Sequence, residues 1–286
     1  MLNVNSAAKR LRIGIVAGNF TDLPAFSLGP HGSERDKYRE VKLAGYEAVQ
    51  GGDADYCRDT GLAVIASGVV PSAAAADSFA NECRSRGAVM ASCIAGYGYE
   101  SERECDVLVK SILTASSRHG VPILIETHRG SITQDAWRTV QLIRRTPELL
   151  LTGDFSHWFT GQEMLYGDLP RRLAFLEPVF SRTALVHGRI GNRCCMQVDI
   201  GQGDHPSVPI FEELWTRVMH YFLKCNRSND LWFCPELLGT KYEYARVFPD
   251  GTGELREESD RWLQAGELVR IARHCFNRAL AAKNEE

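Results

Sequence analysis

The chain has 286 residues, 44% of them hydrophobic and 24% charged, which is the composition of an ordinary globular protein. Its formal net charge of −3 gives no reason to expect binding to bulk nucleic acid or to an anionic membrane. No segment approaches the roughly 20 consecutive apolar residues that a membrane span requires. The apolar stretch near the N-terminus is too short for a secretory signal and predicts a first strand instead.

The cysteine content indicates thiols rather than disulfides. The chain has nine cysteines, an odd number, and no C-x-x-C motif. We therefore expect small buried thiols at most of these positions and a protein of the reducing cytoplasm.

Eight short apolar segments predict β-strands that alternate with helical segments. Their apolar character is nearly continuous, as expected for strands buried on both faces of a parallel sheet. The predicted strands are 12–16, 46–50, 62–67, 88–96, 123–127, 149–155, 183–188 and 231–236. Eight repeats without a break in composition predict one α/β domain over residues 1–286, a closed (β/α)8 TIM barrel. A doubly wound open sheet is the alternative, but its glycine-rich phosphate fingerprint after the first strand is missing.

The connecting segments carry helix and loop signals. Residues 104–118 have the 3, 4 spacing of an amphipathic helix, and Ser131 with Gln134 predicts a capping box before a helix. Two long segments, 18–34 and 237–258, are expected to be top-face loops, and loops of that length often serve as lids.

Four consecutive predicted strands end in an acidic residue or a histidine. These residues are Glu126, Asp154, His187 and Glu236. The C-terminal ends of barrel strands meet at one face and carry the catalytic residues. Three carboxylates and one imidazole form a plausible ligand set for a divalent metal. Any one of them could be structural, but the series favours a metal-dependent enzyme.

Such a site predicts proton-transfer chemistry beside a carbonyl group. A metal that chelates a carbonyl oxygen and the adjacent hydroxyl acidifies the α-proton, and a carboxylate can then abstract it. Return of a proton to the opposite face gives epimerisation, and return to the neighbouring carbon gives isomerisation. Loss of a β-hydroxyl gives dehydration, so the four residues leave all three reactions open.

The segments ETH, DFSH, HGRIGNR and CPE resemble those of the sugar phosphate isomerase/epimerase superfamily, which has a xylose isomerase-like TIM barrel. Ketohexose 3-epimerases, hydroxypyruvate isomerase, inosose dehydratase and endonuclease IV belong to it, and the resemblance is strong over about 123–240. It implies that Glu126, Asp154, His187 and Glu236 bind one divalent metal ion. Mn²⁺ is the expected ion, with Mg²⁺, Co²⁺ and Zn²⁺ as alternatives. It also implies that Glu126 and Glu236 form the acid/base pair.

Five further residues are candidate substrate contacts. The family has a substrate-binding His three residues after the metal-binding Asp and a basic residue six after the metal-binding His, which here are His157 and Arg193. His128 and Arg189 each follow a strand-end residue by two positions, so they could reach the substrate or serve only the local structure. Gln197 falls where related chains often carry a Gln.

The leading hypothesis is an isomerase or epimerase of a small sugar, polyol-ketone or hydroxy-keto acid. The alternative is a metal-dependent dehydratase of a keto-polyol such as an inosose, and a non-catalytic metal-binding barrel is a third interpretation. No phosphate-binding signature follows the last two strands, which favours a non-phosphorylated substrate. We expect a carbohydrate-like small molecule as partner, no nucleic acid or membrane, and a homodimer or homotetramer by analogy. Trp158, Phe20 and Tyr97 are expected near the barrel mouth, as sugar-stacking or packing residues.

Overall fold

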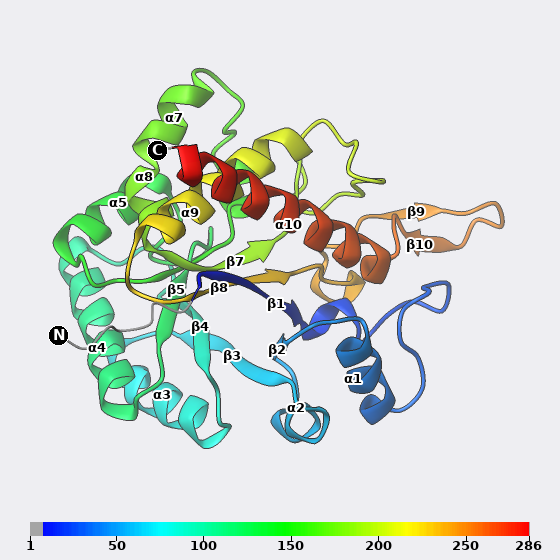
Figure 1. Cartoon of the computed structure of the whole chain (residues 1–286), viewed down its shortest axis with the longest axis horizontal. Coiled ribbons are helices and arrows are strands. Elements are labelled where there is room, and N and C mark those ends of the chain that lie inside the picture. The colour runs from blue at the N-terminus through cyan, green and yellow to red at the C-terminus, as the bar shows by residue number, and fades with distance from the viewer. Residues whose placement is uncertain (1–7, 286) are drawn as a thin grey trace.

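The structure is a computed structural model that describes residues 8–285. The N-terminal segment that is expected not to be a secretory signal begins with residues 1–7, which lie outside the described residues. Eight parallel strands form a closed barrel in chain order, and β8 pairs back with β1 (Figure 1). The strands are β1 (Arg10–Val16), β2 (Ala48–Gln50), β3 (Ala63–Val70), β4 (Met90–Ala95), β5 (Ile123–Glu126), β6 (Leu151–Gly153), β7 (Thr183–Gly188) and β8 (Asp230–Pro235). The predicted single (β/α)8 barrel is thereby confirmed.

Helices surround the barrel and bury its outer face. They are α1 (Glu34–Leu43), α2 (Ala54–Thr60), α3 (Ala76–Ser85), α4 (Glu102–His119), α5 (Ala136–Arg145), α6 (Ser156–Gly161), α7 (Leu169–Phe175), α8 (Glu177–Arg182), α9 (Val208–Lys224) and α10 (Arg261–Glu285). The packing of α9 on the barrel is aromatic, because the Trp215 ring meets Phe233 of β8 edge to face at 5.0 Å.

The barrel interior changes from apolar to polar along the strands. An apolar layer fills it, made of Val16, Ala48, Ile65, Leu124, Leu185, Trp232 and Cys234. Side chains of a strand alternate between its two faces, so residues two positions further along point into the barrel as well. For Leu124, Leu185 and Cys234 these residues are Glu126, His187 and Glu236. The alternation therefore carries polar side chains to the C-terminal mouth.

The predicted capping box at Ser131 and Gln134 is wrong. The cap of α5 is Asp135, whose carboxylate accepts a hydrogen bond from the backbone N–H of Arg138 at 2.8 Å. The Ser131 hydroxyl instead donates to the carbonyl of His128 at 2.9 Å. Aspartate is among the preferred N-cap residues, and Asp135 directly precedes the first helical residue, so it caps α5 in place of Ser131.

The two long segments lie on the side where the strands end. The segment after β1 opens with the 3₁₀ turn η1 (Ala17–Asn19) and then runs as a loop, as predicted. The segment after β8 contains η3 (Thr240–Tyr242) and a hairpin of β9 (Val247–Pro249) and β10 (Leu255–Glu257) that projects from the barrel (Figure 1). The buried Arg261 ties the segments together, because its guanidinium pairs with Asp22 at 2.9 Å and with Glu257 at 2.8 Å.

All nine cysteines are free thiols, as predicted. Six of them are buried, namely Cys57, Cys83, Cys93, Cys105, Cys234 and Cys275. Within residues 8–285, no helix is both long enough and apolar enough to cross a membrane.

Candidate metal centre

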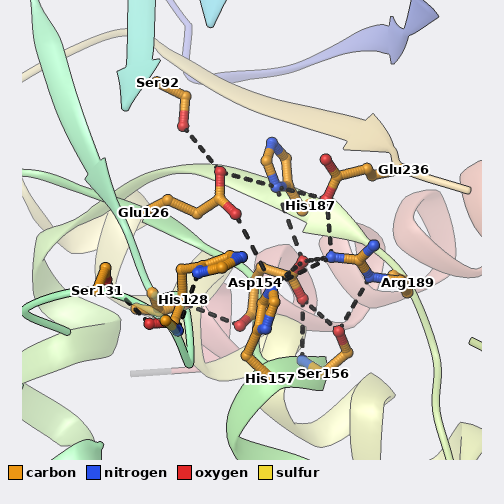
Figure 2. Close-up of polar contacts among 12 residues, drawn as sticks. Ser92, Glu126, His128, Ser131, Asp154, Ser156, His157, His187, Arg189 and Glu236 are labelled. Carbon is orange, nitrogen blue, oxygen red and sulfur yellow. Dashed lines mark hydrogen bonds and ion pairs between the residues drawn. The ribbon is translucent and has the colours of Figure 1, made fainter. Parts of the chain in front are cut away.

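The four strand-end residues converge at the mouth of the barrel. Glu126 ends β5, Asp154 follows β6, His187 lies in β7 and Glu236 follows β8. Each offers one ligand atom, and these atoms all lie within 4.8 Å of one another (Figure 2). Residues from four strands thus form one compact donor set.

The Asp154 carboxylate is oriented by its own local turn. Its Oδ1 accepts hydrogen bonds from the backbone N–H of Ser156 at 3.0 Å and from the Ser156 hydroxyl at 2.6 Å. Its other oxygen, Oδ2, points toward the other three strand-end residues and lies 3.9 Å from Nδ1 of His187. An aspartate that accepts hydrogen bonds on one oxygen presents the other in a fixed direction.

The His187 ring is oriented by Gln50 of β2. The side-chain oxygen of Gln50 lies 3.0 Å from Nε2 of His187, and both side chains are buried. The other ring nitrogen, Nδ1, faces the carboxylates, 3.0 Å from Oε2 of Glu236 and 3.7 Å from Oε2 of Glu126. Histidines that bind metals are usually oriented in this way by a hydrogen bond at the second nitrogen.

The backbone around Glu236 is fixed from two sides. Its N–H donates to the carbonyl of Gly188 at 3.0 Å. Asn19, fully buried, donates to the carbonyl of Pro235 at 2.7 Å and accepts from the N–H of Leu237 at 2.8 Å. The glycine is required, because a Cβ at position 188 would lie 2.4 Å from the Phe233 ring.

Arg189 supplies a buried positive charge inside this donor set. Its Nη2 contacts Oδ2 of Asp154 and lies 3.0 Å from Oε2 of Glu236, while its Nε donates to the Ser156 hydroxyl at 3.1 Å. The ring of Tyr244 lies over the guanidinium at 4.8 Å. A planar, always charged guanidinium suits such a bridge between two carboxylates.

The surroundings separate the pKa values of the three carboxyl groups. Burial raises the pKa of Glu126 to about 8, although the nearby His187 opposes the shift. Burial acts in the same direction on Asp154 and Glu236, but cations outweigh it. Arg189 holds the pKa of Asp154 below its usual value, and His187 followed by Arg189 does the same for Glu236. The pKa of His187 would fall on burial, yet Glu236 and Glu126 raise it to about 9.

The donor set fits a divalent cation. The buried Nδ1 of His187 and Oε2 of Glu236 lie in ion pairs at 3.0 Å but make no hydrogen bond of regular geometry. Leaving such groups unsatisfied is costly, and a cation between them would satisfy both. Three carboxylates, one neutral imidazole, Arg189 and one dication also sum to zero charge. Glu126, Asp154, His187 and Glu236 would hold the ion, while Arg189 would neutralise the remaining negative charge.

A cavity of about 240 Å³ opens over this cluster. Its walls include Glu126 and Glu236 and three of the predicted substrate contacts, Arg189, His128 and His157. The two imidazole rings lie 4.1 Å apart. Burial lowers the pKa of His157 to about 2 and lowers that of His128 as well, so both rings are neutral at pH 7. Neutral imidazoles can donate to or accept from substrate hydroxyls.

Two predicted substrate contacts do not reach this cavity. Arg193 is exposed in the segment after β7, so the structure gives no support for its proposed role. The side-chain amide of Gln197 donates to the carbonyl of Leu238 at 3.0 Å and accepts from its N–H at 2.9 Å. Gln197 therefore holds the segment after β8 in place.

None of the three aromatics expected near the mouth is among the residues that line this cavity. Trp158 and Phe20 are completely buried, and the indole N–H of Trp158 donates to the carbonyl of Thr133 at 2.9 Å. Tyr97 is half exposed and stacks on Tyr99. The aromatic residue that lines the cavity is Tyr244, which the sequence did not single out.

Comparisons with known proteins agree on the fold. The chain is similar to a xylose isomerase-like TIM barrel protein from Mycobacterium smegmatis in complex with magnesium, with 12% identity over 95% of this chain and 98% of that one, at a TM-score of 0.56. It is also similar to a xylose isomerase domain protein from Planctomyces limnophilus, with 13% identity over 95% and 97% of the two chains, at a TM-score of 0.52. No protein-family model matches the chain, and no curated protein sequence matches it. The chain therefore has the xylose isomerase-like TIM-barrel fold that the sequence predicted.

Proposed function

We propose that this protein is a divalent-metal-dependent enzyme that moves a proton beside the carbonyl group of a small carbohydrate-like substrate. The reaction would be an isomerisation or an epimerisation. The observation that carries this proposal is the convergence of Glu126, Asp154, His187 and Glu236 beside a cavity of about 240 Å³ at the barrel mouth. Mn²⁺ is the expected ion, and Mg²⁺, Co²⁺ and Zn²⁺ are alternatives.

The chain's own residues have distinct roles in this proposal. A bound divalent metal would polarise the substrate carbonyl and so acidify the adjacent C–H bond. Glu126 and Glu236 line the cavity and would exchange protons with the substrate carbons. His128 and His157 would bind substrate hydroxyls as neutral imidazoles. Arg189 would keep Asp154 and Glu236 ionised.

Isotope exchange tests this proposal directly. The purified protein would be stripped with a chelator, reloaded with Mn²⁺ and incubated with simple ketoses in deuterium oxide, with ¹H NMR as the readout. We expect deuterium at the carbon beside the carbonyl in the metal-loaded protein and none after chelation. A protein that cannot be reloaded with any divalent metal would contradict the proposal.

The same experiment separates the alternative reaction. Deuterium incorporation with the sugar skeleton intact supports isomerisation or epimerisation. Loss of water with a new enone absorbance supports a dehydratase acting on a keto-polyol. Both reactions begin with the same proton abstraction, so deuterium incorporation tests the step that they share. Loss of water then distinguishes a dehydratase from an isomerase or epimerase.

A further inference from the structure

A second hollow adjoins the cavity over the donor set. This outer chamber has a volume of about 480 Å³ and lies among the segments that follow β1, β2 and β8. It shares five wall residues with the inner cavity of about 240 Å³, namely Val16, Gln50, Ser67, Glu236 and Leu238. Because Glu236 lines both, the chamber begins at one of the proposed proton-transfer groups.

The sizes indicate that the inner cavity is one part of a larger site. Pockets for small ligands and cofactors usually have volumes of roughly 300 to 1,000 Å³. The inner cavity alone falls below that range, whereas the two spaces together fall within it. A substrate that reacts beside Glu236 therefore has room to extend toward the β1 and β2 loops.

The walls of the outer chamber select against negative charge. Asp22 and Glu34 in its wall are already paired, with Arg261 at 2.9 Å and with Lys37 at 2.7 Å. The other charged wall residues are the acidic Asp53 and Glu236 and the basic Lys241. Asp53 also caps α2 through two backbone N–H groups, which fixes the carboxylate in the wall. A phosphate or carboxylate group would meet one cation outside those pairs, Lys241, and two carboxylates, those of Asp53 and Glu236.

Uncharged polar groups suit the same walls. Tyr242 borders the chamber with half of its surface exposed, and Thr21 adds a hydroxyl that donates to the carbonyl of Ala17 at 3.0 Å. Tyrosine presents an apolar ring face together with a polar tip. Hydroxylated rings have both kinds of surface, since their C–H faces are apolar and their hydroxyls pair with carboxylates.

We propose that the substrate carries an uncharged, hydroxylated substituent about the size of a second sugar ring, which occupies the outer chamber. The carbonyl-bearing part then occupies the inner cavity beside Glu236. This inference rests on the proposed function, because it takes the reacting carbons to lie over the donor set.

The test compares two ketoses that differ only by such a substituent. Binding of fructose and of isomaltulose, in which a glucose ring is attached to fructose, would be measured by calorimetry on the Mn²⁺-loaded protein. We expect isomaltulose to bind at least about tenfold more tightly. The variant Thr21→Trp, which fills the chamber, should reduce this ratio to near one, while Thr21→Ser should preserve it. Metal content and thermal unfolding of both variants would show that they remain folded.

The outcomes separate this inference from the proposed function. Equal binding of the two sugars, or a Thr21→Trp variant that keeps the wild-type ratio, would overturn the inference and leave the proposed function standing. Metal-loaded protein that neither binds a ketose nor exchanges its protons would overturn both. A phosphorylated ketose that binds more tightly than isomaltulose would overturn the inference that the substituent in the outer chamber is uncharged.

Discussion

The side-chain oxygen of Gln50 lies 3.0 Å from Nε2 of His187. An amide oxygen can only accept a hydrogen bond, so this arrangement places the ring proton on Nε2. Nδ1 is then the nitrogen that faces Glu126, Asp154 and Glu236. A residue of β2, on the other side of the barrel mouth, thus determines which atom of β7 is available to a metal.

Replacing Gln50 should weaken metal binding without unfolding the protein. Gln50→Met keeps the length of the side chain but removes the acceptor, so we expect a loss of about 10- to 100-fold in Mn²⁺ affinity. Gln50→Glu retains an acceptor and should bind close to the wild-type level. Calorimetric titration of chelator-stripped protein measures the effect. Ser67→Ala, which alters the same cavity wall, is the matched control, and wild-type affinity in Gln50→Met would contradict the orienting role.

Glu236→Gln should abolish proton exchange. The amide is nearly isosteric but cannot take a proton from carbon, so we expect a loss of at least about 100-fold in deuterium incorporation at saturating metal. Far-UV circular dichroism should remain that of the wild type. Glu148→Gln, which changes an exposed glutamate, should retain full exchange. Exchange that persists in Glu236→Gln would remove this residue from the mechanism.

Much of the site follows from strand periodicity, and the rest depends on tertiary contacts. The strand-end series could be predicted because each residue ends an apolar run. The Ser92 hydroxyl donates to Oε2 of Glu126 at 3.4 Å. Gln50 and Ser92 could have been found by the same period of two, since they follow the interior positions Ala48 and Met90. The short β2 run made that alternation hard to recognise.

The loop residues could not be placed from the sequence. Arg193 was located by spacing alone, but Asn192 accepts hydrogen bonds from the N–H groups of Cys194 and Cys195, at 2.8 and 2.7 Å. The tight turn that these bonds close leaves the Arg193 side chain exposed. Tyr244 reaches the cavity because its segment folds back over Arg189, a contact between segments far apart in the chain.

Metal binding should release protons near neutral pH. In the metal-free protein the pKa of Glu126 is raised to about 8 and that of His187 to about 9, so both hold a proton at pH 7. A cation at this site requires both groups deprotonated, and we expect about two protons released per ion. Calorimetry in buffers of different ionisation enthalpy counts them. Affinity should rise with pH up to about 9, and a pH-independent affinity with no proton release would contradict this ligand set.

The same shifts predict how stability of the metal-free protein depends on pH. The folded-state pKa of Glu126 lies above its ordinary value of 4.5, and that of His187 above 6.5. Below pH 6.5 the lowered pKa values of His157 and His128 act in the opposite direction, because the unfolded state then binds protons at these rings that the folded state does not. Above that pH the raised pKa values of Glu126 and His187 dominate and the folded state binds more protons than the unfolded state, so we expect the thermal midpoint of chelated protein to fall between about pH 7 and pH 9. Saturating Mn²⁺ should remove most of this dependence, and a midpoint of chelated protein that rises over the range would contradict the assignment.

Arg189 and a bound metal should partly substitute for one another. Arg189→Met leaves Asp154 and Glu236 buried without their cation, which typically costs about 3 kcal/mol or more in the metal-free protein. A dication at the donor set restores positive charge beside both carboxylates, so the loss should be smaller once metal is bound. The rise in thermal midpoint on adding Mn²⁺ should therefore be larger in Arg189→Met than in the wild type. Arg189→Lys keeps the charge and should behave more like the wild type. Equal metal-induced shifts in all three proteins would show that Arg189 and the cation act on separate groups.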